Sequence, residues 1–413
     1  MICIGDELLI GQVINTNAAW LGEQLAEIGI NCNRVIVLPD KYEVLLSYIT
    51  KAAAKNNLVF ISGGLGPTDD DLTKEVLCKV FDSHLIEDAK ALKDITNVFK
   101  SFGKEVTPRN LEQALVPHNC KVLYNSSGTA PGMLFETDQC MMFSLPGVPF
   151  ELKHIYQNQI FPLLKHKYPD INYLNSTILT IGTGESYLAD VLESYESELP
   201  EFMSLAYLPS PGQVRIRLNL KKGGIEAKNV FQSKLIELNQ LLLPYSYGKG
   251  KETIEDVTFN LLNKYSKSLA VAESCTGGHL SSRIVNIPGA SKIFKGSIIA
   301  YHNELKINEL GVDENVIRKH GAVSSQCVEA MALNIKTKFK SDYGLSTSGI
   351  AGPSGGSTEK PIGLVYIGIS GPSGTSSHKF QLGHARKRFI EVSSSFAINI
   401  LRKTILSDWA TVD

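Results

Sequence analysis

The sequence predicts an α/β protein: two three-layer α/β domains joined by a small α+β middle domain. Three observations lead to this expectation. The 413 residues exceed what one ordinary core holds. Short apolar strands alternate with amphipathic helices toward both ends of the chain, while the segment between them has a different pattern. We therefore divide the chain into residues 1–164, 165–250 and 251–413.

The first domain reads as strands alternating with helices, which predicts a mostly parallel sheet whose ligands gather at the carboxyl ends of the strands. Asn15 can cap a helix that carries Leu21 and Leu25 on one face and ends at Gly29. Met1 already lies in the first strand, so we expect that strand to be short. In order, we expect strands at 1–4, 34–38 and 58–62, and further helices at 42–54 and 72–80.

The middle domain changes character, with strands expected at 176–182 and 214–221 and a helix at 229–243. Its second strand alternates as VRIRLNLK. The stretch PYSYGKGKE, beginning at Pro244, combines turn formers with charge and is our candidate linker. The last domain returns to alternation, with strands at 268–273, 297–301, 343–348 and 363–369 and helices at 277–285, 323–340 and 386–405.

Composition and charge exclude several classes of function. A formal charge of −1 gives no overall field that would attract nucleic acid, and no apolar run approaches the roughly 18 residues that span a bilayer. The seven cysteines are scattered without a CxxC pair, which is typical of reduced thiols. We expect a cytoplasmic protein that binds neither nucleic acid directly nor a membrane.

AESCTGG places Ser274, Cys275 and Thr276 between a strand and a helix, where unpaired N–H groups can stabilise an oxyanion or a phosphate. Taken alone, the stretch favours an ordinary capped turn over a nucleophile by roughly two to one. Lys306 offers a base, because a partly desolvated lysine can accept a proton from serine. The alternative for Lys306 is a solvated surface lysine. No Cys–His pairing is evident for Cys275.

Two glycine-rich loops could hold phosphate through backbone donors. SGIAGPSGGSTEKP could equally form an ordinary hairpin loop. SGGLGPTDDDLTKE follows a strand and opens a helix, but lacks the Lys-Ser/Thr ending of a P-loop. Its three aspartates suit either a solvated helix start or a divalent cation beside a phosphate. Asp6, Glu7 and Asp40 lie on loops expected at the same sheet edge.

AESCTGG, AYHNELKINELGV, HGAVS and SGIAGPSGGSTEKPIG, in this order, resemble the C-terminal domain of the CinA family, which is similar to nicotinamide mononucleotide deamidases. The resemblance implies a dyad in which Ser274 attacks the carboxamide and Lys306 accepts its proton, without a cofactor. Nicotinate mononucleotide and ammonia would be the products. An arginine from LGHARKRF, where His384 replaces the family's usual acid, would hold substrate. The resemblance implies these substrate-binding residues: Thr276, Gly277, Tyr301, Ser348, Gly349, Gly352 and Arg386.

IGDELLIGQVINTNAAWL, GGLGPTDDDLTKE, NSSGTAPGM and LPGVPFEL resemble the molybdopterin-binding fold of the N-terminal domain in the same family. That domain is associated with metal-dependent ADP-ribose pyrophosphatase activity. The resemblance implies that Asp71 is catalytic and that Mg²⁺ or Co²⁺ lies near Asp6, Asp40 and Asp71. The phosphate and nucleotide site would be lined by Gly63, Gly64, Gly66, Gly128, Pro146 and Gly147.

Together these features predict a bifunctional pyridine-nucleotide salvage hydrolase acting on nicotinamide mononucleotide and ADP-ribose, and the family suggests a homodimer. Two alternatives remain open. The N-terminal domain could be a nucleotide or pterin binding module without turnover, or the whole chain could be a competence-related regulatory protein. The presence of both Ser274 and Lys306 favours the enzyme.

Overall fold

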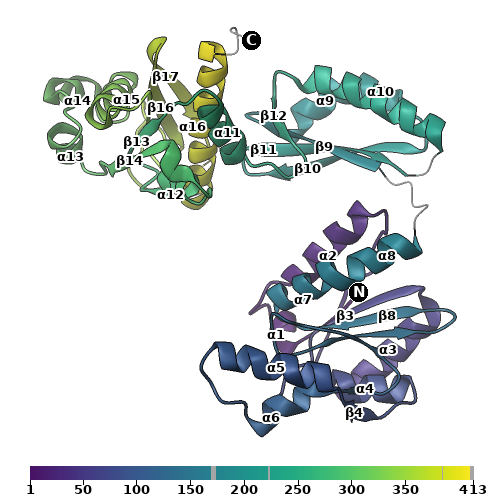
Figure 1. Cartoon of the computed structure of the whole chain (residues 1–413). Helices are drawn as coiled ribbons and strands as arrows, with labels where there is room; N and C mark the ends of the chain where they lie inside the picture. Colours follow the sequence, from purple (N-terminus) through teal and green to yellow (C-terminus); the bar gives the residue numbers. More distant parts are fainter. Residues whose placement is uncertain (169–173, 222–223, 384, 410–413) are drawn as a thin grey trace. The chain divides into compact units, whose positions relative to one another are not determined.

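The computed structural model describes residues 1–168, 174–221, 224–383 and 385–409. It divides into two compact units, Met1–Tyr173 and Leu174–Asp413 (Figure 1). Each unit is built from helices packed on sheets, and the α/β class expected from the sequence is what the structure shows. Within the described residues, no helix is both long and apolar enough to cross a membrane.

The first unit contains a six-stranded sheet in the order β2-β1-β3-β8-β7-β6. The first four of these strands are parallel, whereas β7 and β6 run antiparallel to their neighbours. The strands are β1 (Ile2–Ile4), β2 (Ile36–Leu38), β3 (Leu58–Ser62), β6 (Lys121–Leu123), β7 (Gly132–Glu136) and β8 (Met141–Leu145). A separate ribbon pairs β4 (Leu85–Glu87) with β5 (Leu115–Pro117).

Helices cover both faces of this sheet, so its central strands are buried on both sides. Leu45 and Val76 pack on one face, from α3 (Tyr42–Lys55) and α4 (Thr73–Val80). Leu21 and Leu152 pack on the other, from α2 (Thr16–Glu27) and α7 (Pro149–Ile155). The remaining helices are α1 (Asp6–Leu9), α5 (Ala89–Ser101), α6 (Pro108–Leu111) and α8 (Phe161–Lys167).

The second unit begins with a four-stranded antiparallel sheet in the order β10-β11-β9-β12. Leu188 and Phe231, from its two helices, pack with Ile216 of the sheet in one core. The strands are β9 (Leu174–Ile181), β10 (Met203–Ser210), β11 (Gln213–Leu220) and β12 (Ser246–Lys249), and the helices are α9 (Glu185–Ser197) and α10 (Ile225–Leu242).

The stretch PYSYGKGKE is not a linker, and that prediction was wrong. Its residues Ser246–Lys249 form β12, which pairs antiparallel with β9 around a bulge between Ser246 and Gly248. Tyr247 is buried and its hydroxyl donates to Oε1 of Gln213 at 3.0 Å. Backbone pairing at the sheet edge and burial of one aromatic ring outweigh the turn-forming composition.

The rest of the second unit is built on a five-stranded sheet in the order β14-β13-β15-β16-β17. The first three of these strands are parallel and the last two antiparallel. The strands are β13 (Leu269–Glu273), β14 (Phe294–Ile299), β15 (Tyr343–Gly349), β16 (Leu364–Gly371) and β17 (Gly374–Gln381). The carboxyl ends of β13, β14 and β15 bring the loops after residues 273, 299 and 349 to one edge.

Two layers of helices enclose this sheet. Leu280, Leu262 and Leu401 pack on one face, from α12 (His279–Val285), α11 (Ile254–Lys264) and α16 (Arg386–Trp409). Met331 packs on the other, from α15 (Ser325–Phe339). Two short helices, α13 (Asn303–Asn308) and α14 (Glu314–His320), complete the domain.

Candidate functional site

Ser274 lies immediately after β13, at the edge of the sheet where loops converge. Its N–H donates to the carbonyl oxygen of Thr347 at 2.9 Å, and the residue is 8% exposed. Gly277 and Gly278 follow with φ angles of 57° and 96°, in the left-handed region that side chains disfavour. The two glycines therefore allow the sharp turn that separates Ser274 from α12.

The turn is held by Glu273, a fully buried carboxylate that the sequence reasoning missed. It accepts hydrogen bonds from backbone N–H groups and from hydroxyls of the turn. The only signal in the sequence was an acid at the end of an apolar strand, directly before SCTGG. The donors are Thr276 Oγ1 (2.6 Å), Gly278 N (2.9 Å), Leu280 N (3.1 Å), Ser281 N (2.8 Å) and Ser281 Oγ (2.5 Å).

Because Glu273 occupies the N–H groups at the start of α12, those groups cannot also bind substrate. Among the residues that the structure describes, the N–H groups of Cys275 and Thr276 donate to no backbone oxygen. They are therefore the turn amides that remain for a developing oxyanion. The Thr276 hydroxyl, which donates to Glu273 and lies 2.8 Å from Thr347 Oγ1, is engaged within the turn.

Lys306 is buried, with 1% of its surface exposed, rather than solvated at the surface. Its Nζ lies 2.8 Å from the carbonyl oxygen of Ala300 and 3.3 Å from that of Tyr301. Within the described chain no carboxylate is bonded to it, and burial lowers the pKa of Lys306.

The lysine and the serine are linked through the backbone. The N–H of Ala300 donates to the carbonyl oxygen of Glu273, the residue before Ser274, at 2.8 Å. The structure contains no hydrogen bond between Ser274 Oγ and Lys306 Nζ among its described residues. Such catalytic bonds often tighten only when substrate binds.

Cys275 is not arranged as a nucleophile. It is buried, and burial raises the pKa of its thiol to about 12. The neighbouring imidazole, His279, bonds through Nδ1 to Ser394 Oγ at 2.9 Å. Burial and the charge of Arg283 lower the pKa of His279. Cys275 packs in the hydrophobic core of this domain.

Arg386 joins two of the loops that the sequence singled out. Its Nη2 donates to the hydroxyl of Tyr301 at 2.9 Å and its Nη1 to the carbonyl oxygen of Gly352 at 3.0 Å. Both partners are uncharged, so its positive charge is not neutralised by a carboxylate in the described chain. His384, in the same stretch, lies outside the described residues.

Ser348 and Gly349 are placed at the same edge but have structural partners. The hydroxyl of Ser348 donates to the carbonyl oxygen of Ala322 at 2.8 Å, and the side chain is buried. A Cβ at Gly349 would lie 2.6 Å from the carbonyl oxygen of Leu364, so only glycine fits between β15 and β16. Their nearness to substrate stays a prediction.

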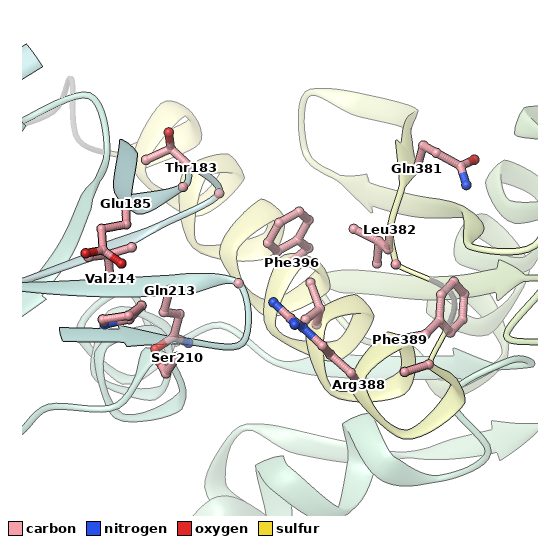
Figure 2. A pocket seen from close by; sticks show the side chains of 17 residues that line it. Thr183, Glu185, Ser210, Gln213, Val214, Gln381, Leu382, Arg388, Phe389 and Phe396 are labelled. Atoms are coloured by element: carbon pink, nitrogen blue, oxygen red, sulfur yellow. The ribbon is translucent and has the colours of Figure 1, made fainter. Parts of the chain in front are cut away.

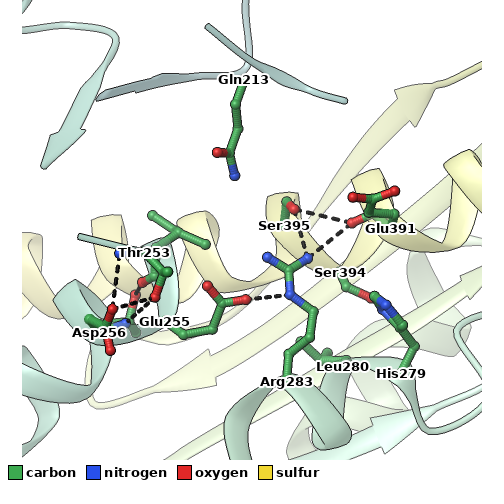
Figure 3. Close-up of polar contacts among 12 residues, drawn as sticks. Gln213, Thr253, Glu255, Asp256, His279, Leu280, Arg283, Glu391, Ser394 and Ser395 are labelled. Carbon is green, nitrogen blue, oxygen red and sulfur yellow. Dashed lines mark hydrogen bonds and ion pairs between the residues drawn. The ribbon is translucent and has the colours of Figure 1, made fainter. Parts of the chain in front are cut away.

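Figure 3 shows how α12 is fastened to α16, the helix that begins with Arg386. Arg283 of α12 pairs with Glu255 of α11. It also donates from Nη1 to the carbonyl oxygen of Glu391 at 3.1 Å and to Ser395 Oγ at 2.7 Å. This half-buried guanidinium fixes the helix after Ser274 relative to the helix that carries Arg386.

In the first unit, the turn after β3 also depends on glycine. Gly63 and Gly64 have φ angles of 110° and 67°, and a Cβ at Gly63 would overlap the carbonyl oxygen of Ile4. Thr73 Oγ1 donates to the carbonyl oxygen of Gly63 at 3.1 Å. Asn17 donates from Nδ2 to the carbonyl oxygen of Gly147 at 2.7 Å. A Cβ at Gly147 would lie 3.5 Å from the Cα of Gly63, so the turns after β3 and β8 lie side by side.

Pro146 and Gly66 are also placed in these turns. The carbonyl oxygen of Pro146 accepts from Ser62 Oγ at 3.3 Å. Asp71 accepts from both N and Oγ1 of Thr68, at 2.9 and 2.6 Å, and a Cβ at Gly66 would lie 2.5 Å from Oδ2 of Asp71. The carboxylate of Asp71 therefore closes its own loop.

The other acids gather around Asp40, whose Oδ2 accepts from the N–H of Asp6 at 3.1 Å. Burial, followed by the charges of Asp6, Glu7 and Asp70, raises the pKa of Asp40. Among the described residues, no group of three or more His, Cys, Asp or Glu side chains could hold a metal ion. Mg²⁺ commonly takes one or two carboxylates and completes its shell with water and substrate phosphates, and the acids around Asp40 fit only that mode.

Lys74 is a further charged residue that the sequence reasoning missed. It is buried on α4, and its Nζ donates to the carbonyl oxygen of Gln113 at 2.9 Å. Burial lowers the pKa of Lys74 to about 8, against the opposing charge of Asp71. The motif DLTKE showed a lysine beside the acid, but not that helix packing would bury it.

Gly128 lies against a buried carboxylate, that of Glu151. Asn125 donates from Nδ2 to Glu151 Oε2 at 2.5 Å and to the carbonyl oxygen of Ala130 at 3.0 Å. Burial raises the pKa of Glu151, and a Cβ at Gly128 would overlap its carboxylate. Glycine is therefore required in the NSSG turn for Glu151 to sit beneath it.

Comparisons with known proteins cover both ends of the chain. Residues 251–405 match the model described as "CinA C-terminal domain", and residues 1–166 match "Probable molybdopterin binding domain". The chain is 39% identical to a CinA-like protein of Cytophaga hutchinsonii, over 98% of this chain and 97% of that protein. It is also 39% identical to a CinA-like protein of Flavobacterium psychrophilum, over 99% of each. A solved structure, the competence/damage inducible protein CihA from Agrobacterium tumefaciens, is 29% identical with a TM-score of 0.35, covering 37% of this chain and 94% of that chain.

Proposed function

The chain belongs to the CinA family, and from that premise we propose that it is a bifunctional pyridine-nucleotide hydrolase. Its C-terminal domain would convert nicotinamide mononucleotide to nicotinate mononucleotide and ammonia. Its N-terminal domain would hydrolyse the pyrophosphate of ADP-ribose with a divalent cation. The observation that carries the first activity is the buried Lys306, which has two carbonyl partners and no carboxylate partner among the described residues.

Those two carbonyl partners suit a neutral amine. A neutral lysine has two N–H donors and one lone pair, and the carbonyl oxygens of Ala300 and Tyr301 can accept both donors. The lone pair is then left to accept the proton of Ser274. Burial shifts the lysine toward this neutral form, because a buried cation is costly.

In the proposed reaction, Ser274 Oγ forms a bond to the carboxamide carbon while its proton passes to Lys306. The oxyanion is stabilised by the N–H groups of Cys275 and Thr276. Lys306 then gives the proton to the leaving nitrogen, the C–N bond breaks, and ammonia leaves an ester on Ser274. Water attacks that ester with Lys306 as base, and the proton returns to Ser274.

Arg386 would bind the phosphate of the mononucleotide. A guanidinium is a strong partner for phosphate, and within the described residues that of Arg386 bonds only to uncharged groups of Tyr301 and Gly352. Both of these lie on loops that the family motifs cover.

For the N-terminal domain, we propose that the turns after β3 and β8 bind a nucleotide diphosphate. The cation would supply charge neutralisation and polarise the pyrophosphate. Glycine at positions 63, 64 and 147 would let a phosphate approach the backbone N–H groups of the turns. The acids around Asp40 would hold the ion together with the substrate phosphates. A nucleotide-binding module without turnover is the second candidate, and the bonding of the Asp71 carboxylate to Thr68 within its own loop favours it.

The two activities are tested separately on the purified full chain. Nicotinamide mononucleotide should yield ammonia and nicotinate mononucleotide in equal amounts, and no turnover would contradict the first activity. ADP-ribose with Mg²⁺ or Co²⁺ should yield AMP. Asp71→Asn should lower AMP formation and Asp69→Asn should not, because Asp71 is bonded to Thr68 whereas no hydrogen bond joins Asp69 to Thr68 among the described residues. If neither metal yields AMP, the N-terminal domain is a binding module.

A further inference from the structure

A groove along α16 lies outside both sites described above. It is formed within the second unit, where α16 meets the antiparallel sheet. One cavity of about 660 Å³ and another of about 530 Å³ adjoin, since Pro244 and Lys403 line both. A third cavity of about 600 Å³ continues from the first at Thr183 and Phe396, which are visible in Figure 2. These volumes fall in the range of small-molecule sites.

The first cavity is aromatic. Tyr187 and Tyr245 meet edge to face with ring centroids 5.8 Å apart, and their hydroxyls lie 3.1 Å from each other. Phe380 and Phe396 form a second edge-to-face pair at 5.0 Å. Burial and the nearby charge of Lys403 lower the pKa of His378, which favours its neutral form, and the charged side chains on this cavity are Lys403 and Asp408. Flat rings of this kind suit a planar heteroaromatic base.

The second cavity is cationic. Arg402 is 8% exposed, donates from Nε to Asn399 Oδ1 at 3.0 Å, and donates from Nη2 to the carbonyl oxygen of Ser246 at 3.3 Å. Its Nη1 has no partner among the described residues. Lys403 and Lys249 line the same cavity.

No carboxylate in the described chain pairs with this buried guanidinium. Glu252, the acid on the cavity wall, accepts instead from the N–H of Lys249 at 2.8 Å. A buried charge without a counter-charge is costly, so an anion that enters here gains free energy from Arg402.

Asn399 connects the two cavities. It is 8% exposed, and its Oδ1 is committed to Arg402. Its Nδ2 donates to no group in the described chain, yet the side chain lines the aromatic cavity. A hydrogen-bond donor therefore stands beside the aromatic rings, where the polar edge of a base or a ribose hydroxyl can accept it.

We propose that this groove binds a nucleotide, with its base among Tyr187, Tyr245 and His378 and its phosphate at Arg402 and Lys403. The site is distinct from Ser274 and from the glycine turns of the first unit. It lies on the same helix as Arg386, the first residue of α16. The proposal does not depend on either proposed activity.

The test is photolabelling of the full chain with 8-azido-AMP, followed by peptide mapping, and calorimetric titration with AMP. Label should appear on peptides that contain Tyr187, Tyr245 or residues 373–404. Lys403→Glu and Tyr187→Ala should each weaken AMP binding in the groove at least tenfold. Both side chains line the groove and are exposed to solvent, so these substitutions should leave the fold intact. Lys319→Glu is the matched control, because Lys319 is exposed on α14 and lines none of the three cavities.

Ser274→Ala and Asp71→Asn should leave this labelling unchanged, which separates the groove from the two proposed activities. Adenosine and inorganic phosphate should each compete at least tenfold less well than AMP. Label confined to the first unit or to the Ser274 loops would overturn the proposal. So would groove labelling that Lys403→Glu does not reduce, or phosphate that competes as well as AMP.

Discussion

Lys306 Nζ lies 2.8 Å from the carbonyl oxygen of Ala300, inside the domain and away from any carboxylate in the described chain. Because Ala300 is itself bonded to Glu273, the base and the serine turn share one backbone connection. Burying a lysine of this kind lowers the stability of the fold. Replacing it should therefore raise the stability of the protein while it lowers the activity.

Lys306→Met should abolish ammonia release from nicotinamide mononucleotide, by at least about 10³-fold, because no base remains for Ser274. The same change should stabilise the protein near neutral pH, by up to a few degrees in Tm, since it removes a cation that folding must desolvate. Thermal unfolding and the ammonia assay measure the two effects. Unchanged activity with Lys306→Met would exclude it as the base.

The pH dependence follows from the direction of the Lys306 shift. Burial lowers its pKa below 10.5. While Lys306 is mostly protonated, kcat/KM should rise about tenfold per pH unit, and it should reach its plateau before the pH reaches 10.5. The contribution of Lys306 to the free energy of unfolding changes with pH in the same direction, becoming more favourable as pH rises. The unfolded chain binds this proton more readily than the folded chain. The loss of folding stability caused by Lys306 therefore grows as pH falls below 10.5, and it is complete below the pKa of Lys306 in the folded protein.

A reaction through Cys275 would behave differently. Its thiol has a pKa of about 12, so activity would still be climbing above pH 10.5. A pH–rate profile of wild-type protein that keeps rising beyond that point would contradict the lysine-base account.

Glu273→Gln should loosen the serine turn. An amide replaces one accepting oxygen with a donor that faces N–H groups, so hydrogen bonds from the turn are lost. We expect a loss of about 1–3 kcal/mol in unfolding free energy and a fall in kcat larger than any change in KM. Glu304→Gln is the control, because the Glu304 side chain is 78% exposed. Equal kcat in the two variants would argue against positioning by Glu273.

Gly128→Ala should destabilise the first unit, because the new Cβ would overlap the buried carboxylate of Glu151. A cost of about 1–3 kcal/mol is expected for overpacking of this kind. Gly22→Ala is the matched control, since Gly22 lies in α2 with nothing within 4 Å of an added Cβ. Chemical denaturation should show Gly128→Ala less stable than wild type and Gly22→Ala at least as stable. Equal stability of both would contradict the close packing at Glu151.

The sequence predicted many of the strands and helices that position the sites, because alternation of buried strands with amphipathic helices is a local property, but it did not predict β8 (Met141–Leu145), which leads into the turn at Pro146 and Gly147. The strand at 58–62 and the helix beginning at Arg386 occur where they were expected. The resemblance to the family named Tyr301, Gly352 and Arg386 as substrate-binding residues, which stays a prediction, and the hydrogen bonds of Arg386 join the three.

What the sequence did not reveal depends on contacts between distant segments. Glu273 acts through the hydrogen bonds it accepts after the chain has turned, and Lys74 is buried only when α4 packs beside Gln113. The edge strand β12 was missed because its composition is that of a turn, while its pairing partner β9 lies some 70 residues earlier.

The most direct test of the central claim compares ammonia release from nicotinamide mononucleotide by Ser274→Ala and Cys275→Ala. The account predicts a loss of at least about 10³-fold in kcat/KM for Ser274→Ala and activity close to wild type for Cys275→Ala. Ammonia release undiminished in Ser274→Ala would contradict the serine–lysine dyad.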